Sequence, residues 1–449
     1  MSTSQLKLFL IIIWAMVASV IIVGLVIWGV SSQAAQPAQP TPNETPTLTP
    51  SPSEPPTPTP LPTIVIIRAT PRKGGTPLIV GDTETPVTPQ MFSFGSQAAP
   101  GFDPLTGLKV DDPSRLERRP VAVKISTFPR SLRPYQSGLT KADVVYEYYI
   151  EDGLTRFIAV FYGQDAERAG PVRSGRYFDE NIMRMYHSSL VFADADKRVA
   201  DYLLGSVDLR DLLFIPRDDH CPPLCRDDSI PSDAGGGYNN VFVNTAGVGA
   251  FVENSKQPLR PTFFNSVFHL IPNRPVSRIY TTYSHYSYNY WDYDETTKKY
   301  LRYSDTTDSV NGQGQVYAPH IDVLTGQQLS ADNVVVLLVP HLFKNAFDRA
   351  DQLFDIQLIG SGSAFTFIDG QMYRGLWKRD QLDQPIALFG DNNNPLSLKP
   401  GITYYQVIDP ESIAKLTDAS MNFTFFIPPR VLTATPTEPK PSATPRKHK

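Results

Sequence analysis

The residues best suited to chemistry lie between positions 144 and 176, where glutamates and arginines are embedded in strand-like sequence. Two carboxylates close together could act as a general acid and a nucleophile, whereas arginines ahead of a helix suit recognition of an anion. This stretch is therefore the predicted functional surface, and we expect binding there rather than an assigned catalytic role. The candidate binding residues are Glu147, Glu151, Arg156, Arg173, Ser174 and Arg176.

A β-hairpin must position the two glutamates. Asp152 and Gly153 stand between two runs of β-branched and aromatic residues, a pattern that predicts a two-residue type I′ turn. Such a turn fixes which residues lie opposite each other on the two strands. The predicted pairs are Glu151 with Leu154, Tyr149 with Arg156, and Glu147 with Ile158.

This register predicts a charged face and a core face. Arg156 would lie between Glu147 and Glu151, within diagonal reach of both. The glutamates would stand about 13 Å apart along one strand at about 3.4 Å per residue, which is too far for joint attack on one glycosidic bond. A Glu/Arg network is therefore favoured over a paired-carboxylate enzyme, and a purely structural ion cluster explains the same pattern.

A helix is predicted to follow this hairpin, from about Tyr177 to His187, with Ser174 as a candidate cap. Arginines are disfavoured at a helix start because of the partial positive charge there. Arg173 and Arg176 would instead suit a bound anion beside free backbone N–H groups. The alternative is an internal pair with Asp179 or with the hairpin glutamates.

Composition bounds the structure around this site. The chain has 449 residues, of which 41% are hydrophobic and 11% aromatic, enough for one or two sizeable cores. Many of its 42 prolines fall in residues 36–98 and 428–445, whose Thr/Pro/Ser/Glu composition predicts disorder. The net charge of -4 argues against a nucleic-acid partner, and none is expected.

The first 30 residues predict a membrane anchor. Residues 8–30 form a largely apolar run of 23, long enough to span about 30 Å of hydrocarbon. A signal peptide cleaved near Ser32 and Ala34 is the alternative, but this apolar run exceeds the usual length of one. Lys7 precedes the run and the next basic residue is Arg68, which predicts a single-pass cell-membrane protein with its N-terminus inside and its folded part outside.

The two cysteines are consistent with an outside location. Cys221 and Cys225 lie in HCPPLC, and a disulfide between them suits an oxidising exterior. Free thiols and a zinc site with His220 are the alternatives, although a second pair of ligands is lacking. No cofactor or metal is expected.

Coarse periodicity predicts an α+β fold in two parts. A strand near residues 190–193 and a helix near 197–204 indicate a mixed α/β domain over residues 99–273. Residues 274–427 read as a mainly antiparallel β domain with a second Asp-Gly turn at Asp369 and Gly370. The transmembrane segment (1–30) and a disordered linker (31–98) precede these domains, and a basic disordered tail (428–449) follows them.

Motifs for catalysis are sparse. The chain has no Gly-rich phosphate loop, no G-x-S-x-G and no HExxH. His320 and Asp322 occupy alternate positions, hence one face of a strand, but two residues are too few to define an acid–base or metal pair.

Several segments resemble a known family. RPYQSGLTKADVVYE, EDGLTRFIAVF and GPVRSGR are similar to the N-terminal part of the YerB-like envelope lipoprotein family. HIDVLTGQQL, NVVVLLVPH and GSGSAFTFIDGQMYRGLWKR are similar to its C-terminal part. The similarity spans about residues 102–410. It implies a two-part bacterial, extracytoplasmic protein of unestablished biochemical function, and it assigns no catalytic residue.

The chain departs from the expected family pattern in three places. Members are commonly anchored through a lipidated cysteine, whereas no cysteine precedes Cys221, so the apolar helix must serve as the anchor. Asp194 and Asp196 stand where small residues are expected, and Asn239-Asn240 stands where His-Asn is expected. A mechanism that relied on that histidine would be in doubt.

Two functions fit these observations. The first is a non-catalytic binding or scaffolding protein of the cell envelope, whose partner is a cell-wall polymer or another envelope protein. The second is a cell-wall hydrolase or transferase that acts through Glu147 or Glu151, with Arg156 and Arg173 holding an anionic group. The absence of catalytic motifs favours the first.

Overall fold

The computed structural model describes residues 100–259, 262, 264, 274–310, 312–345, 348 and 351–428. All of them belong to the second of two compact units, Ile66–Lys449. The predicted membrane span and linker lie outside the described residues, as does the predicted tail beyond residue 428. Within the described ranges, no helix is long and apolar enough to cross a membrane.

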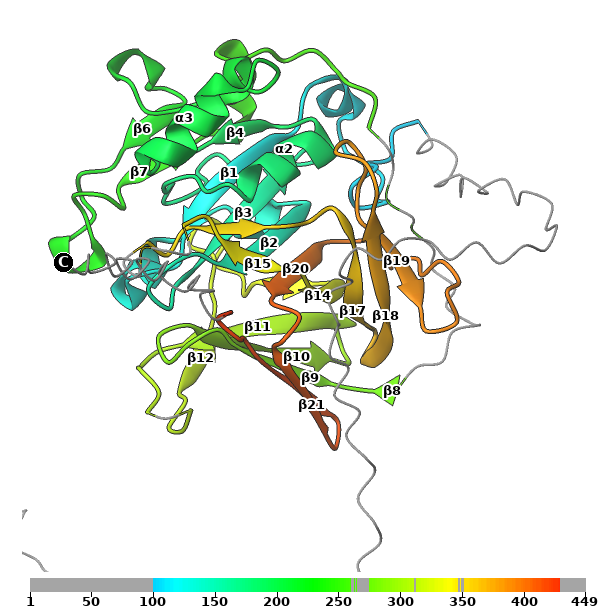
Figure 1. The fold of residues 1–449 in the computed structure, drawn as a ribbon. Coiled ribbons are helices and arrows are strands. Elements are labelled where there is room, and N and C mark those ends of the chain that lie inside the picture. The colour runs from blue at the N-terminus through cyan, green and yellow to red at the C-terminus, as the bar shows by residue number, and fades with distance from the viewer. Residues whose placement is uncertain are drawn as a thin grey trace, which may run out of the picture. The chain divides into compact units, whose positions relative to one another are not determined.

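An eleven-stranded sheet runs through the described chain (Figure 1). Its first half carries strands from the C-terminal part of the sequence and its second half strands from the N-terminal part. In spatial order, the strands are β19 (Ala387–Gly390), β18 (Gln371–Arg379), β17 (Gly360–Ile368), β14 (Asn333–Leu338), β20 (Thr403–Ile408), β2 (Val144–Tyr149), β3 (Thr155–Phe161), β1 (Val121–Ser126), β4 (Ser189–Val191) and β5 (Leu213–Phe214), with β8 (Arg274–Pro275) paired to β18.

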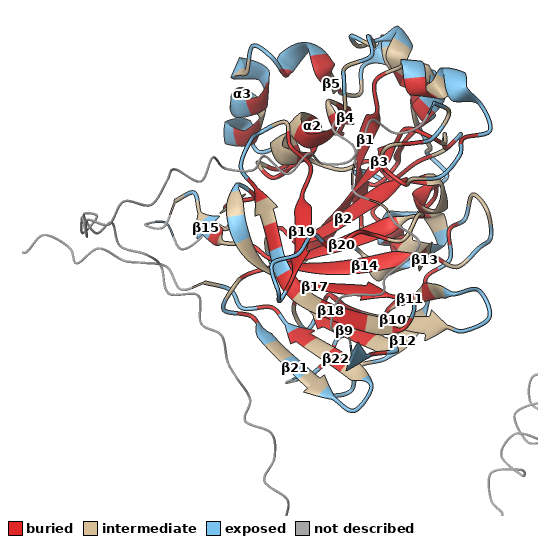
Figure 2. Cartoon of the chain, turned by 90° about the vertical axis from the view of Figure 1, so that its right-hand side faces the viewer, coloured by how far each residue is buried: buried red, intermediate tan, exposed pale blue. Residues whose placement is uncertain are grey.

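The middle of this sheet is covered on both faces. β20 lies between β14 and β2 and runs parallel to both. Every residue of β1, β2, β14 and β20 is buried (Figure 2). Strands of this kind read as continuous runs of apolar and aromatic residues because neither face meets water.

A second, seven-stranded sheet packs against the first. Its inward residues Ile279, Trp291 and Tyr300 are fully buried and alternate with partly exposed ones, the pattern of a sheet with one face on the core. The rings of Trp291 and Tyr404 meet at 4.8 Å and join the two sheets. In order, its strands are β12 (Tyr317–Pro319), β11 (Lys299–Asp305), β10 (Tyr288–Asp294), β9 (Arg278–Thr282), β22 (Ser420–Thr424) and β21 (Ile413–Thr417), with β13 (Ser330–Ala331) paired to β11.

Helices are few and short in the part of the chain that the structure describes. The predicted helices are confirmed as α2 (Asp179–Tyr186) and α3 (Lys197–Gly205). Two small hairpins complete the fold, β6 (Leu224–Arg226) with β7 (Val241–Val243) and β15 (His341–Phe343) with β16 (Phe354–Ile356). Short 3-10 turns are η1 (Pro113–Glu117), η2 (Arg130–Tyr135), η3 (Leu139–Lys141), η4 (Arg210–Leu212), η5 (Asp218–His220), η6 (Ser232–Ala234) and η7 (Thr245–Ala250).

The described fold is therefore mostly β with few helices. The β-rich character of the prediction is confirmed, but the N-terminal part contains less helix than a mixed α/β layer implies. The eleven-stranded sheet takes strands from both sides of residue 273. The division of the chain into domains at that residue stays a prediction.

The predicted hairpin turn forms, but the predicted register is wrong. Asp152 and Gly153 have φ angles of 54° and 78°, which a type I′ turn requires at both central positions. The N–H of Leu154 donates to the carbonyl of Glu151, yet the N–H of Ile150 also donates to the carbonyl of Leu154, both at 2.9 Å. Two residues of one strand thus oppose one residue of the other, which is a β-bulge.

This bulge moves the pairing by one residue. Tyr149 pairs with Thr155, Tyr148 with Arg156, and Glu147 with Phe157. The residues of the turn cannot reveal this change of register. The extra residue lies before the turn, and the Asp-Gly pair that predicts the turn is the same with or without it.

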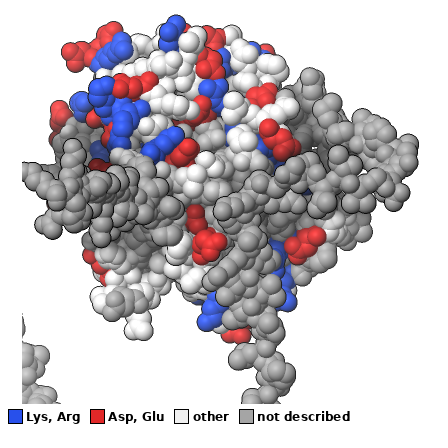
Figure 3. Space-filling view, in the orientation of Figure 1, with Lys and Arg blue, Asp and Glu red and all other residues white. Residues whose placement is uncertain are grey.

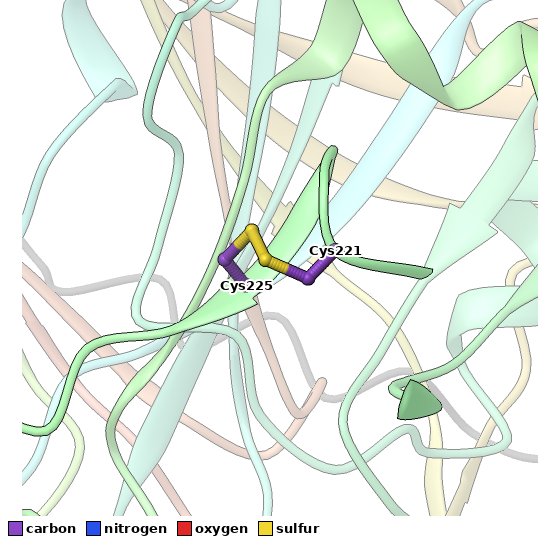
Figure 4. Close-up of a disulfide and its surroundings, with 2 residues drawn as sticks. All are labelled: Cys221 and Cys225. Atoms are coloured by element: carbon purple, nitrogen blue, oxygen red, sulfur yellow. A yellow bond between two sulfur atoms is a disulfide. The ribbon is translucent and has the colours of Figure 1, made fainter. Parts of the chain in front are cut away.

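The two cysteines form the predicted disulfide. The sulfurs of Cys221 and Cys225 are bonded at the start of β6 (Figure 4). The His220 ring packs against Phe214 and its Nδ1 lies 2.6 Å from the carbonyl of Ile215. The cysteines are therefore neither free thiols nor zinc ligands here.

Two buried carboxyl groups tie the start of the described chain to β2. Asp103 and Asp143 are each 1% exposed and share a side-chain hydrogen bond. Asp143 also accepts the N–H groups of Tyr162 and Gly163. Burial raises the pKa of Asp103 to about 6, and burial followed by the nearby Asp103 raises the pKa of Asp143. We therefore infer that the two carboxyl groups share a proton at acidic pH.

This pair predicts a pH-dependent stability. The folded-state pKa of Asp103 lies above its ordinary value of 3.8. Its contribution to the stability of the fold is therefore present at low pH and is lost as the pH rises through about 6. The free energy of unfolding of the wild type should fall between pH 5 and pH 8. In Asp103→Asn this fall should be smaller by about 1–2 kcal/mol. Urea titrations at both pH values measure this. The exposed Asp111→Asn serves as the control, and equal pH slopes for wild type and Asp103→Asn would contradict the shared proton.

Candidate functional site

Strand β2 sends the two candidate glutamates to different surroundings. Successive residues of a strand point to opposite faces, so Glu147 and Tyr148 face apart. Arg156 is paired with Tyr148 and shares its face, the one toward α2. Glu147 faces the second sheet, where it meets Arg302. The prediction that Arg156 lies between Glu147 and Glu151 is therefore wrong.

Five of the six predicted residues nevertheless come together. We call Glu151, Arg156, Arg173, Ser174 and Arg176 the arginine cluster. The bulge turns Glu151 toward α2, where its Oε2 accepts from Arg176 Nε at 2.8 Å and its Oε1 from Arg176 Nη2. Arg176 thus takes the internal alternative and pairs with a hairpin glutamate.

The segment before α2 is held by its backbone. Helix α2 begins at Asp179 with Phe178 at its N-cap, so the prediction that Ser174 caps this helix is wrong. The N–H of Arg173 donates to the carbonyl of Lys124, and the N–H of Arg176 donates to Asp179 Oδ2 at 2.8 Å. These bonds fix where the arginine side chains leave the loop.

Two buried arginines of the described chain, Arg156 and Arg379, take part in none of the ion pairs found there. Arg379 donates to four neutral oxygen atoms, whereas among the described residues one acceptor is found for Arg156. The Arg156 side chain is only 6% exposed, and its Nη1 donates to the carbonyl of Ser174 at 2.6 Å. Burial, with the nearby Arg176 next in weight, lowers the pKa of Arg156 to about 9. A nearly buried guanidinium without a carboxylate partner is costly unless another anion approaches it.

Arg173 stands at the rim of the same cluster. Its guanidinium lies 4.8 Å from the centre of the Tyr238 ring, and its Nη1 donates to the carbonyl of Tyr238 at 3.2 Å. Its Nε is buried and has no partner among the residues that the structure describes. Figure 3 shows Lys and Arg side chains gathered on the upper part of one face, around β6 and β7, with Asp and Glu among them.

A fully buried triad lies beneath the cluster. Lys124 Nζ and Asp179 Oδ1 are 3.0 Å apart, and both side chains are 0% exposed. The Tyr148 hydroxyl donates to the same oxygen at 2.5 Å. Burial lowers the pKa of Lys124 to about 7. Because nothing from solvent reaches this triad, we assign it the role of fixing α2 to the sheet.

The sequence carried one signal for this triad that we missed. Lys124 interrupts the apolar run VAVKIS, and a charged residue on a strand buried on both faces needs a partner.

Glu147 is enclosed on the other face of β2. It is 2% exposed, and its Oε2 accepts from Arg302 Nη2 at 2.9 Å and from Asn289 Nδ2 at 3.3 Å. Its Oε1 accepts from the Thr155 hydroxyl at 3.0 Å. Glu147 therefore does not join the arginine cluster, and Arg302 is a partner that the sequence did not indicate.

His320 and Asp322 do not form the pair considered from their spacing. β12 ends at Pro319, before both residues. Asp322 accepts the N–H groups of Gly138 and Thr140, at 2.9 and 2.8 Å, whereas His320 contacts Ser304 and Gln136. Asp322 therefore anchors the loop before β2.

Comparison with known proteins places this architecture in a family of two-part proteins. Residues 105–256 match the family described as "Protein of unknown function (DUF3048) N-terminal domain", and residues 279–405 match its C-terminal domain. The chain belongs to this two-part, YerB-like family, and the resemblance stated from its motifs is confirmed.

One relative illustrates the match, both by its sequence and by its crystal structure. The putative lipoprotein YerB of Bacillus subtilis (strain 168) is 27% identical over 329 residues, which are 70% of this chain and 88% of the relative. The crystal structure of the YerB protein from Bacillus subtilis matches with a TM-score of 0.55 and 25% identity, covering 68% of this chain and 96% of that one.

The buried triad gives a direct test of its structural role. Lys124→Met would leave the Asp179 carboxylate buried without its cation, which should cost about 3–5 kcal/mol of stability. The double variant Lys124→Met/Asp179→Leu should recover part of that loss, because a buried ion pair can be replaced by apolar side chains. Chemical denaturation measures both.

The matched control is Lys197→Met, which removes an ion pair whose side chains are 84% and 62% exposed. Its effect should lie within about 0.5 kcal/mol. A Lys124→Met protein as stable as this control would exclude the proposed role of the triad.

Proposed function

We propose that this chain is a membrane-associated protein of the bacterial cell envelope that binds an anionic cell-wall polymer without catalysing a reaction. The observation that carries the proposal is Arg156. Its charge is nearly buried, and its one acceptor among the described residues is the carbonyl of Ser174. An anion bound there offsets the cost of burying that charge and gains charge-assisted hydrogen bonds.

The surroundings of Arg156 suit a polymer better than a lone ion. Arg173 lies at the rim and supplies a second positive charge, since Glu151 is already engaged by Arg176. The adjacent Tyr238 ring is 53% exposed. An exposed aromatic ring beside cations offers a stacking surface for a sugar next to a site for its anionic substituent.

The cellular location follows from sequence and relationship together. The relative from Bacillus subtilis carries the name of a putative lipoprotein, which supports a membrane-associated envelope location for this chain. The apolar run at residues 8–30 would anchor it, N-terminus inside, and the Pro/Thr-rich residues 31–98 would hold the folded part away from the membrane. The Cys221–Cys225 disulfide suits an oxidising exterior.

The hydrolase or transferase alternative has less support. Glu147 and Glu151 face different surroundings, and each is held by its own arginine, Arg302 and Arg176. Because the two carboxylates lie in separate networks, they cannot act together on one glycosidic bond. Another envelope protein as the partner is the second alternative, and the experiment below separates it from a polymer.

The binding proposal predicts that Arg156→Gln and Arg173→Gln weaken co-sedimentation of the detergent-solubilised full chain with purified cell walls. Each loss should be about tenfold, because one charge-assisted hydrogen bond contributes about 1.5–3 kcal/mol. Binding by the wild type should also weaken as salt is added. Arg210→Gln, which removes an arginine whose side chain is 53% exposed, is the control and should bind normally.

Three outcomes would count against this function. Unchanged sedimentation of folded Arg156→Gln would remove its central residue. Binding that disappears when wall-associated proteins are stripped would indicate an envelope protein as the partner. Release of soluble wall fragments that Glu147→Gln abolishes would indicate the hydrolase.

A further inference from the structure

A second polar pocket lies on the face of β2 and β3 opposite the arginine cluster. Its volume is about 340 Å³, open mouth included, and η2, the β2–β3 hairpin, the turn before β10 and strand β11 surround it. The enclosed part has room for about one or two water molecules. The residues that matter for its chemistry are Arg133, Gln136, Glu147, Arg302, Ser304 and His320.

The hydrogen bonds around His320 fix the position of its proton. Gln136 donates its Nε2 to the carbonyl of Ser126, so its Oε1 accepts from His320 Nε2, 2.7 Å away. Arg302 Nε donates to the Ser304 hydroxyl at 3.2 Å, so that hydroxyl donates in turn to His320 Nδ1 at 2.9 Å. Both ends give the same tautomer, with the proton on Nε2. His320 and Ser304 therefore have no donor left for a ligand.

Two arginines of the pocket lining still have N–H groups for which no acceptor is found among the described residues. Arg302 is 2% exposed and uses Nη2 for Glu147 and Nε for Ser304, but its Nη1 has no partner among the described residues. Arg133 uses Nη1 and Nη2 for Asp305, and its buried Nε likewise lacks a partner in the described part of the chain. Two unsatisfied guanidinium groups call for a hydrogen-bond acceptor.

The two guanidinium groups in the pocket lining favour a charged acceptor. Burial, then Arg133, then Arg302 hold the pKa of His320 well below its usual range. The two charged groups that lower the pKa of this imidazole are thus both positive. Glu147 and Asp305 also line the pocket, but each is paired with an arginine. A negative acceptor is favoured where the potential is positive.

We propose that this pocket binds the carboxylate of a small organic acid or of a peptide chain end, held by Nη1 of Arg302 and Nε of Arg133. The two oxygens of a carboxylate take the place of the one or two waters for which there is room. Guanidinium N–H groups are well matched to carboxylate oxygens, and the bonds are charge-assisted. The site is independent of the polymer-binding function proposed for the arginine cluster.

The test compares the melting temperature and the heat of binding of the full chain in acetate, glycylglycine, glycylglycine amide and phosphate, at constant pH and ionic strength. Wild type should be stabilised by a carboxylate, because a ligand of the native state raises its stability. Acetate alone as a ligand indicates a free acid, whereas glycylglycine binding without binding of its amide indicates a chain end. Phosphate binding that Arg133→Gln weakens as much as it weakens acetate binding would overturn the proposal.

Two variants assign the response to the pocket. Arg133→Gln leaves Asp305 paired with Arg130, and Glu147→Gln/Arg302→Gln removes both charges of the buried pair together. Each should lower carboxylate affinity about tenfold, the equivalent of one charge-assisted hydrogen bond. Arg210→Gln, which removes an arginine whose side chain is 53% exposed, should bind carboxylate as the wild type does and is the control.

The proposal fails if the wild type binds neither acetate nor glycylglycine, or if both folded variants bind as the wild type does. A crystal soaked in acetate tests the same proposal by showing where the ligand binds. Planar density between Arg302 and Arg133 supports the site, and water alone there rejects it.

Discussion

The parallel pairing of β20 with β2 joins the two halves of the sequence and creates both polar surfaces. Glu147 and Gln406 lie side by side in this pairing although 259 residues separate them, and the rings of Tyr146 and Tyr405 stack at 4.5 Å. With β20 in place, one face of β2 meets the second sheet and the other meets α2. The enclosure of Glu147 depends on that arrangement, because Gln406 of β20 and Arg302 of the second sheet both contact its carboxylate.

The alternation of side chains along β2 then sorts the charges. Glu147 points to the second sheet, whereas the bulge at Ile150 and Glu151 brings the next glutamate round to the side of α2. One extra residue in a strand is enough to exchange the faces of everything beyond it. Two carboxylates that look like one site in the sequence therefore serve two separate networks.

Local sequence was sufficient for the features that depend on neighbouring residues. The Asp152-Gly153 turn, helix α2 and the Cys221–Cys225 disulfide all follow from residue types at short spacing. The bulge was not predictable, because Ile150 and Glu151 fit a regular strand equally well. Arg302 was not identifiable as the partner of Glu147, since 155 residues lie between them and the order of the strands decides their contact.

The charge balance distinguishes the structural networks from the candidate site. Buried ion pairs seldom add stability over apolar packing, so their presence alone is weak evidence of function. The charge of Lys124 is neutralised by Asp179 within the protein, as an architectural role requires. Arg156 is as deeply placed but faces a carbonyl where a carboxylate would be expected. Arg379, the other buried arginine outside the ion pairs of the described residues, donates to four neutral oxygen atoms, whereas one acceptor is found for Arg156 among them. This difference is what supports the proposal that an anion binds at Arg156.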